Sequence, residues 1–535
     1  MTDIEEPKQD NRLPRRFCLW KFTITGGLLG LALSLSSVSL EGTLSHAIKI
    51  PSPAPKPSFS LIPPGESEER IVRKAANIVP TANQLAWQEM EFIAFAHFGV
   101  NTFTDREWGE GTEDPAVFNA TEFDARQWIR VLKDAGVRML ILTAKHHDGF
   151  CLWPSRTTNH SVKSSPWRGG RGDVVREVAD ACREAGLKVG IYLSPWDRHE
   201  PSYGDSPAYN EHFRKQLREL LSDYDEISEV WFDGACGEGP NGKRQEYDWP
   251  SYYRVVRELQ PRALIFGMGP DIRWVGTEAG YGRETEWSVV PVTTRDTADS
   301  ASLDDLFLPG DMTAPDLGSR AKIRGAKALA WYPAETDVSI RPGWFYHAKE
   351  DGEVKSPEEL LDIYFCSVGR NSVLLLNVPP DRRGRIHEND AASLLGFRRL
   401  LDGIFKTNLA AGAGVRASSE AGGHPATAIL DGDALTFWQA PEGTESAAVE
   451  YDLGREAAFD VAVLQENIRL GQRVEEFSLQ AWNGKEWATF AGGTTIGYRR
   501  LLRFTETSAR KVRLVISKSR TEPTLAGFGL FRSRS

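Results

Sequence analysis

Short apolar runs of strand length alternate, along residues 87–405, with segments whose apolar positions repeat at helical spacing. A period near 3.6 places such positions on one face of a helix. The first of these faces ends at Gly136, the second at Gly186 and the third just before Pro261, all residue types that terminate helices. The first five apolar runs are residues 92–97, 139–143, 189–193, 230–232 and 264–268.

This alternation indicates βαβ units around a parallel sheet. Later apolar runs predict the sixth, seventh and eighth strands at residues 286–290, 328–331 and 373–377. Eight units over about 310 residues are typical of an α/β fold of the TIM-like (β/α)8 barrel type with enlarged loops. A doubly wound sheet is the alternative, but neither a Gly-x-Gly-x-x-Gly motif after the first strand nor a P-loop is present. We therefore expect residues 87–405 to form a barrel.

A different pattern begins near residue 406, where short alternating segments are separated by turn residues and show no helical period. It predicts a C-terminal antiparallel β-sandwich over residues 406–535. The segment resembles discoidin-like (coagulation factor 5/8 type C) carbohydrate-binding domains in Val415-Arg416-Ala417-Ser418-Ser419, Ala428-Ile429-Leu430-Asp431-Gly432 and Phe437-Trp438. Such domains bind sugars or pack against a catalytic barrel, and the sequence leaves both roles open.

The N-terminal 47 residues have the order of an export signal. Basic residues precede an apolar run at 22–40, and Ser45-His46-Ala47 resembles a cleavage site. Arg15-Arg16 raises a twin-arginine alternative, and a run of about 19 residues is also near the length of a membrane anchor. We expect cleavage, an exported periplasmic or extracellular protein, and no stable membrane insertion of the mature chain. Residues 48–86 are expected to be a Pro-rich linker and N-terminal segment.

Charge and cysteine usage exclude several functions. A net charge of −10 argues against nucleic-acid binding, which needs concentrated Lys and Arg. The 5 cysteines include no Cys-x-x-Cys pair, so neither a zinc framework nor a disulfide scaffold is expected. We expect no cofactor, and the oligomeric state stays open.

Polar residues stand where four successive apolar runs end. Because the carboxyl ends of barrel strands meet at one rim, these side chains are predicted to converge there. They are His97, His146, His147, Tyr192 and Asp233. The imidazoles and Asp233 are also metal-ligand types, but no His-x-His pair follows the first strand and no candidate for a carboxylated lysine is evident. We therefore expect hydroxyl recognition without a metal.

Several motifs follow one another along the chain: His97-Phe98-Gly99, His146-His147-Asp148-Gly149-Phe150, Trp153-Pro154-Ser155, Trp231-Phe232-Asp233-Gly234, Asn371-Ser372-Val373-Leu374-Leu375-Leu376-Asn377-Val378 and Gly384-Arg385-Ile386. Together, and in this order, they resemble the α-L-fucosidases of glycoside hydrolase family 29. The resemblance implies a retaining hydrolase, in which one carboxylate attacks the anomeric carbon and a second carboxyl, about 5 Å away, acts as acid and then base. It implies that Asp233 is the nucleophile.

The acid/base is less fixed by the resemblance, and Glu278, Glu284 and Glu286 are the candidates. Residues 271–280 resemble the family branch selective for α-1,3/1,4-linked fucose, in which the acid/base glutamate lies within this motif, so Glu278 is preferred. Residues 103–109 and 335–344 also resemble that branch. The implied partner is a branched fucosylated oligosaccharide or glycoconjugate, in which a galactose neighbours the fucose.

The resemblance also assigns substrate-binding roles. His97, His146, His147 and Tyr192 are expected to bind fucose hydroxyls, since a polyhydroxylated ring needs donors and acceptors. Trp153 is expected to supply an apolar wall or a hydrogen bond, and Trp231 the floor. A loop carboxylate and an aromatic ring, Asp337 and Trp344, are expected to hold the galactose. The alternatives are a broad-specificity α-L-fucosidase, a barrel glycosidase for another sugar such as galactose, and a non-catalytic glycan-binding protein.

Overall fold

The computed structural model describes residues 56–294, 304, 306–307, 312–433 and 435–533. The predicted export signal and the first residues of the predicted linker lie outside this part of the chain. In the part that is described, every helix is too short or too polar to cross a membrane.

Eight parallel strands form the central sheet, in the order β6-β5-β4-β3-β2-β12-β11-β7. A parallel bridge between Phe266 and Ile272 connects β6 to β7, the two ends of this order, so the sheet closes into a near-barrel. This confirms the predicted TIM-like fold. The strands are β2 (Phe92–Ala96), β3 (Met139–Lys145), β4 (Lys188–Leu193), β5 (Glu229–Phe232), β6 (Leu264–Gly267), β7 (Arg273–Trp274), β11 (Ala334–Ser339) and β12 (Ser372–Asn377).

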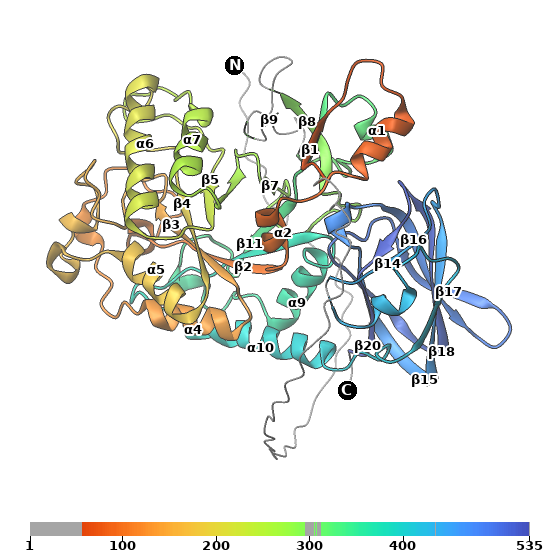
Figure 1. Cartoon of the computed structure of the whole chain (residues 1–535). Coiled ribbons are helices and arrows are strands. Elements are labelled where there is room, and N and C mark those ends of the chain that lie inside the picture. The colour runs from red at the N-terminus through yellow and green to blue at the C-terminus, as the bar shows by residue number, and fades with distance from the viewer. Residues whose placement is uncertain (1–55, 295–303, 305, 308–311, 434, 534–535) are drawn as a thin grey trace, which may run out of the picture. The chain divides into compact units, whose positions relative to one another are not determined.

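Helices cover the outside of these strands (Figure 1). In α4 (Ala125–Asp134), Asp124 caps the N-terminus by accepting from the Gln127 amide, and Trp128, Ile129 and Leu132 form the buried face. The apolar face thus packs on the sheet as its spacing predicts. The helices are α3 (Val100–Thr104), α4 (Ala125–Asp134), α5 (Val174–Ala185), α6 (Ser206–Asp223), α7 (Trp249–Leu259), α9 (Pro357–Cys366) and α10 (Glu388–Phe405), whereas α8 (Arg320–Ile323) packs against a separate antiparallel sheet.

Two predicted barrel strands belong to another sheet. The apolar runs at residues 286–290 and 328–331 contribute to an antiparallel sheet of order β1-β10-β8-β9. The sixth and seventh barrel strands are β7 and β11 instead. A strand of two residues is too short to show a period, and β11 carries Glu335 and Asp337 on alternate positions, so neither forms an apolar run. The antiparallel strands are β1 (Phe59–Leu61), β8 (Val289–Thr294), β9 (Leu306–Phe307) and β10 (Ala328–Trp331).

The described residues before the barrel are folded rather than extended as a linker. They contain β1, which pairs with β10, followed by α1 (Glu68–Ala75) and α2 (Ala82–Gln88). Thr81 and Gln84 form a capping box at the start of α2. Trp87, near the end of α2, is buried within the barrel interior cluster.

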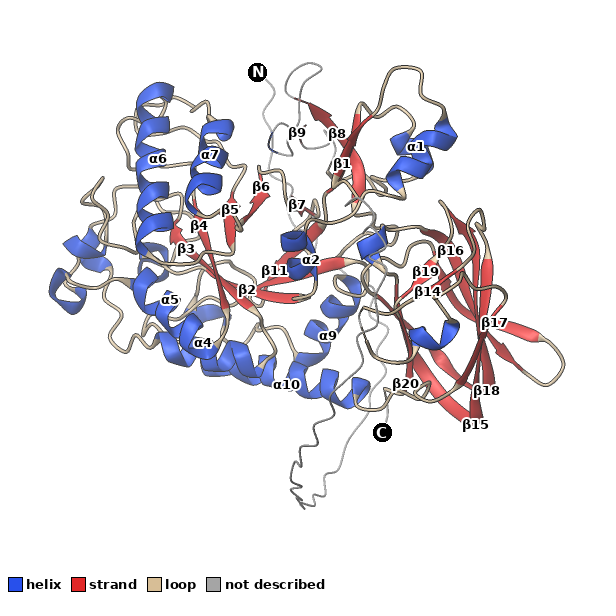
Figure 2. Cartoon of the chain, in the orientation of Figure 1, coloured by secondary structure: helices blue, strands red, loops and turns tan. Residues whose placement is uncertain are grey.

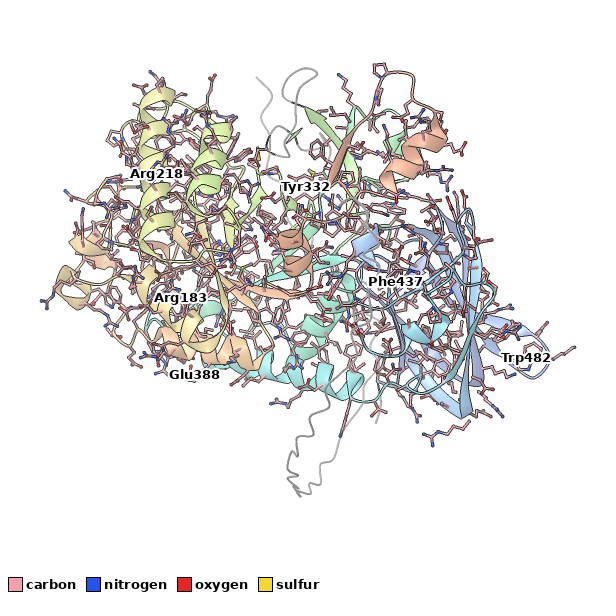
Figure 3. The ribbon with its side chains drawn as sticks, in the orientation of Figure 1. Arg183, Arg218, Tyr332, Glu388, Phe437 and Trp482 are labelled. Atoms are coloured by element: carbon pink, nitrogen blue, oxygen red, sulfur yellow. The ribbon has the colours of Figure 1, made fainter. Side chains whose placement is uncertain are left out.

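After α10 the described residues contain strands and short 3-10 turns but no α-helix (Figure 2). The pairings are antiparallel, and register shifts interrupt the ladder between β15 and β18. Trp482, labelled in Figure 3, lies at the end of β16 and is 37% exposed. The predicted antiparallel β domain is therefore confirmed. Its strands are β13 (Gly414–Ala417), β14 (Trp438–Gln439), β15 (Ala447–Gln465), β16 (Val474–Trp482), β17 (Trp487–Gly493), β18 (Arg500–Ser519), β19 (Thr524–Leu525) and β20 (Gly527–Phe531).

Candidate active site

Asp233 directly follows β5, so its carboxylate lies at the carboxyl end of the barrel, where such folds place reacting groups. Its Oδ1 accepts the Ala235 amide N–H at 2.8 Å, and its Oδ2 accepts the Tyr192 hydroxyl at 3.0 Å. The side chain nevertheless keeps 27% of its surface exposed. The carboxylate is thus held in one orientation while remaining open to a ligand.

Three histidines surround this carboxylate. The His147 Nε2 lies 4.0 Å from Asp233 Oδ2, and its Nδ1 lies 2.7 Å from the Ser194 hydroxyl. The rings of His146 and His147 are 4.1 Å apart, while His97 Nδ1 lies 2.9 Å from Asn377 Oδ1. The structure therefore brings together the strand-end residues that the sequence predicted.

Burial sets the charge of these imidazoles. It lowers the pKa of His97 to about 3, lowers that of His146 well below its ordinary value, and lowers the pKa of His147. Neutral imidazoles offer one N–H donor and one acceptor each, which suits sugar hydroxyls. The His146 Nδ1 is buried and has no hydrogen-bond partner within the described part of the chain.

Tyr192 and Trp231 form an aromatic layer below Asp233. Burial, together with the charge of Asp233, raises the pKa of Tyr192 well above its ordinary value, so the hydroxyl remains a donor to that carboxylate. The two ring centroids are 5.3 Å apart, and Trp231 stacks on Phe266 at 4.2 Å. The Trp231 indole N–H donates to Glu335 Oε1 at 2.9 Å. The predicted role of Trp231 as the floor beneath fucose stays a prediction.

Glu278 lies on the loop between β7 and β8. Its Oε2 accepts the Trp344 indole N–H at 3.3 Å. The residue is exposed, yet neighbouring protein displaces enough water to raise the pKa of its carboxyl, and the negative charge of Asp233 raises that pKa further. A carboxyl with a raised pKa beside a second carboxylate is the electrostatic arrangement that a general acid needs.

The other two candidates for the acid lie in different surroundings. Glu286 is fully buried and pairs with Arg273 and, at 3.2 Å, with Arg283. The Glu284 side chain is 81% exposed and lies 3.5 Å from Arg370. The charge of Asp233 raises the pKa of Glu278, whereas neither Glu284 nor Glu286 contributes to that shift.

Asp337 is buried within β11, not in a loop as the sequence suggested. Its Oδ1 accepts the Trp274 indole N–H at 2.8 Å. Burial, followed by the charge of Glu278, raises its pKa to about 8. Trp344 lies on the loop after β11, with its ring 5.1 Å from that of His97. Both residues therefore border Glu278.

Trp153 does not join this group in the structure. Its side chain is buried in the layer between sheet and helices, and its indole N–H donates to Glu219 Oε2 of α6 at 2.7 Å. These contacts anchor the loop after β3 to the outer helix. The predicted role of Trp153 as a wall for fucose has no support in this position.

The sequence did not single out Trp108 or Glu107 as separate site residues. The Trp108 ring is 52% exposed and packs edge-on against His147 at 5.9 Å. Glu107 accepts the backbone amides of Trp344 at 2.8 Å and of Phe345 at 3.1 Å. Both residues lie inside the segment 103–109 that carried the resemblance, and a Trp next to an acidic residue was the signal available in the sequence.

Two glutamates face one another inside the barrel. Glu229 Oε2 accepts the Trp87 indole N–H at 2.8 Å, and Glu335 similarly accepts from Trp231. The other oxygen of each carboxyl accepts no N–H from the residues that the structure describes. Burial raises the pKa of Glu229 to about 8, and burial together with the charge of Glu229 raises the pKa of Glu335 well above its ordinary value. One proton shared between the carboxyls would satisfy both oxygens.

This pair makes stability depend on pH. The folded protein holds a proton that the unfolded chain releases near pH 4.5, so stability is complete below that pH and falls as pH rises towards 8. We expect the wild type to lose on the order of 2–4 kcal/mol of unfolding free energy between pH 5 and 9 from this pair. In Glu335→Gln, the side-chain amide can accept from Trp231 and donate to Glu229, so both hydrogen bonds form without a titrating proton.

Urea unfolding at several pH values measures the effect. The decline should be smaller in Glu335→Gln, whereas Glu486→Gln, an exposed change in the turn between β16 and β17, should follow the wild type. An equal decline in all three proteins would show that the carboxyls do not share a proton.

Comparison with known proteins gives one consistent result. The sequence profile of the α-L-fucosidase family matches residues 98–402, and that of the F5/8 type C domain matches residues 414–527. The chain is 44% identical to α-L-fucosidase 1 of Arabidopsis thaliana over 466 residues, covering 85% of this chain and 88% of that protein.

Solved structures agree with the sequence comparisons. A Ruminococcus gnavus family 29 fucosidase in complex with fucose shares 33% identity with a TM-score of 0.75, covering 86% of this chain and 96% of that one. The structure of SpGH29 shares 38% identity with a TM-score of 0.77, covering 85% of this chain and 98% of that one.

Proposed function

The chain belongs to the α-L-fucosidases of glycoside hydrolase family 29, and from this premise we propose that it is a retaining exo-enzyme for α-1,3/1,4-linked fucose on branched glycans. Asp233 is the nucleophile and Glu278 the acid/base in this proposal. The observation that carries it is the pairing of Asp233, oriented by two hydrogen bonds, with Glu278, whose pKa is raised partly by the charge of Asp233.

The proposed reaction has two displacements. Asp233 attacks the anomeric carbon while Glu278 protonates the departing glycosidic oxygen, which gives a covalent fucosyl-enzyme. Glu278, now ionised, then removes a proton from the water that releases fucose. Retention of configuration follows because each displacement inverts the anomeric centre once.

Fucose recognition is assigned to the rim around Asp233. The neutral imidazoles of His97, His146 and His147 would bond the hydroxyls, and the aromatic layer of Tyr192 and Trp231 would lie below the ring. The R. gnavus relative was solved with fucose bound, which supports fucose as the ligand.

Linkage selectivity is assigned to the surroundings of Glu278. An acid/base stands beside the glycosidic oxygen, so the residues bordering it face the leaving group. Asp337 and Trp344 border Glu278 and are therefore proposed to meet the branched sugar, including its galactose. The basic and apolar pattern of residues 1–47 further supports export to the periplasm or exterior.

Released fucose from three substrates tests the proposal. A Lewis-type trisaccharide should be cleaved at least about tenfold faster than an α-1,2-fucosylated glycan, with an aryl fucoside as a reference for the chemistry alone. NMR should show α-fucose as the first product. No release from any substrate would refute the enzyme, equal rates on the two glycans would indicate the broad-specificity alternative, and β-fucose would refute retention.

A further inference from the structure

The loop that carries Glu278 runs from Trp274, the last residue of β7, to Val289, the first residue of β8. The barrel packs closely against this loop at Gly280. The φ of Gly280 is +80°, and an added Cβ there would lie 3.2 Å from Ile363 and 3.3 Å from Val338. Further along, Gly282 N–H donates to Cys366 O at 2.7 Å. The barrel therefore holds the middle of this loop.

The end of the same loop is held by the C-terminal domain. Gln472, fully buried, donates from Nε2 to the Glu286 carbonyl at 2.9 Å and accepts the Ser288 amide N–H on Oε1 at 2.7 Å. One side-chain amide thus satisfies a backbone acceptor and a backbone donor two residues apart. Asn371 also donates to the Glu286 carbonyl at 3.2 Å.

A second connection lies two residues earlier. The Glu284 carbonyl accepts from Arg500 Nη1 at 2.8 Å and from the Thr494 hydroxyl at 3.3 Å. Thr494 also lies 2.8 Å from the Thr285 hydroxyl. The backbone from residue 284 to residue 288 is therefore tied to three side chains of the C-terminal domain.

These ties reach both ends of the Glu278 loop. The side chain of Glu286, whose backbone Gln472 fixes, pairs with Arg273 in β7, where the loop begins. It also pairs with Arg283, whose Nε donates to the Ala314 carbonyl at 2.7 Å. This buried ion pair closes the loop at its base, and an uncompensated buried charge would be costly if Glu286 moved away.

We propose that the C-terminal domain is a working part of the active site, in which Gln472, Arg500 and Thr494 are positioning residues for Glu278. Whether or not the domain also binds sugars, its hydrogen bonds fix the span of the loop from which the acid reaches the glycosidic oxygen. The inference rests on the proposed function, because it takes Glu278 as the acid/base.

Substrates whose leaving groups differ in their need for a proton test the function of the acid separately from that of the nucleophile. A nitro-substituted phenolate departs without a proton, whereas unsubstituted phenol and a sugar need protonation by the acid. Misplacing the acid therefore slows only the second kind, while disturbing Asp233 or the fold slows both. The value of kcat/KM reports the first displacement and is the quantity to compare.

In the full chain, Gln472→Met removes both backbone hydrogen bonds with little change in volume. We expect kcat/KM to fall about tenfold for phenyl fucoside and the Lewis-type trisaccharide, and less than about twofold for the nitrophenyl fucoside. Gln480→Met, the same exchange on β16, where Gln480 instead accepts from Arg513, should resemble the wild type. Thr494→Val, at an exposed side chain, should lower the ratio of kcat/KM for phenyl fucoside to kcat/KM for nitrophenyl fucoside about threefold.

Glu278→Gln provides the reference. If it slows phenyl but not nitrophenyl fucoside while Gln472→Met and Thr494→Val keep the wild-type ratio, the positioning role is refuted and the proposed function stands. If Glu278→Gln slows both substrates equally, the acid assignment fails and the inference fails with it. If Gln472→Met does not fold, the test is made with Thr494→Val and Arg500→Lys, by comparing kcat/KM for phenyl fucoside with kcat/KM for nitrophenyl fucoside. Equal losses on both substrates in these variants would also overturn the proposal.

Discussion

Asp233→Ala is expected to lower kcat on the order of 10⁴-fold while fucose binding remains measurable by calorimetry. The variant removes the atom that is to bond the anomeric carbon. Binding should persist because the hydroxyl contacts are assigned to other side chains, including His97 and His147. Burial lowers the pKa of both imidazoles, and loss of the Asp233 charge, which raises the pKa of His147, leaves them neutral. The change is therefore in the chemical step rather than in recognition.

A small anion can replace the missing carboxylate. Azide should enter from the face that Asp233 occupied and displace an activated aryl leaving group in one step, which gives β-fucosyl azide with inverted configuration. Asp402→Ala, an exposed change on α10, should keep the wild-type rate. Activity above about 1% of wild type in Asp233→Ala would mean that another group is the nucleophile.

The sequence prediction rested on the rule that polar residues ending successive barrel strands converge at one rim. It located His97, His147, Tyr192 and Asp233. In the structure the Tyr192 hydroxyl donates to Asp233, the Tyr192 ring lies 6.2 Å from that of His97, and His147 Nε2 lies 4.0 Å from the Asp233 carboxylate. The rule succeeds because a parallel barrel brings the carboxyl ends of its strands to one rim, whatever lies between them in the sequence.

The rule failed where a strand is not apolar. In β11, Glu335 and Asp337 occupy the inward positions that barrels usually fill with branched apolar side chains, and each accepts one indole N–H, from Trp231 and Trp274 respectively. Hydrophobic periodicity cannot reveal such a strand, because the compensating donors come from distant segments. The buried runs of β8 and β10 were apolar for a different reason, since they pack in a separate antiparallel sheet.

Trp153 illustrates a second limit. An indole suits a sugar wall and a buried core equally well, and the choice depends on which partner accepts its N–H. Here that partner is Glu219, 66 residues further along the chain and on the outer helix α6. The pairing of Gln472 with Glu286 and Ser288 spans an even longer stretch, so the link between the two domains was likewise invisible in the sequence.

Glu278→Ala is expected to separate the two steps that the acid/base serves. With nitrophenyl fucoside the first displacement should proceed, because this leaving group needs no proton, and the fucosyl-enzyme should accumulate as a burst. Its hydrolysis should slow on the order of 10²-fold or more, since no base activates the water. With phenyl fucoside the first step itself should slow by a similar factor. Rapid-quench kinetics on both substrates measures the difference.

Azide distinguishes the two carboxyls by stereochemistry. In Glu278→Ala it should attack the fucosyl-enzyme from the face that the leaving group vacated, which gives α-fucosyl azide, the opposite anomer from the Asp233→Ala product. Glu284→Ala, at a neighbouring exposed glutamate, should show neither the burst nor the rescue. The same anomer from both variants would contradict two carboxyls on opposite faces of the ring. If azide rescued Glu284→Ala but not Glu278→Ala, the acid/base would be Glu284. It would then not be Glu278, the residue that contacts Trp344 and whose pKa the charge of Asp233 raises.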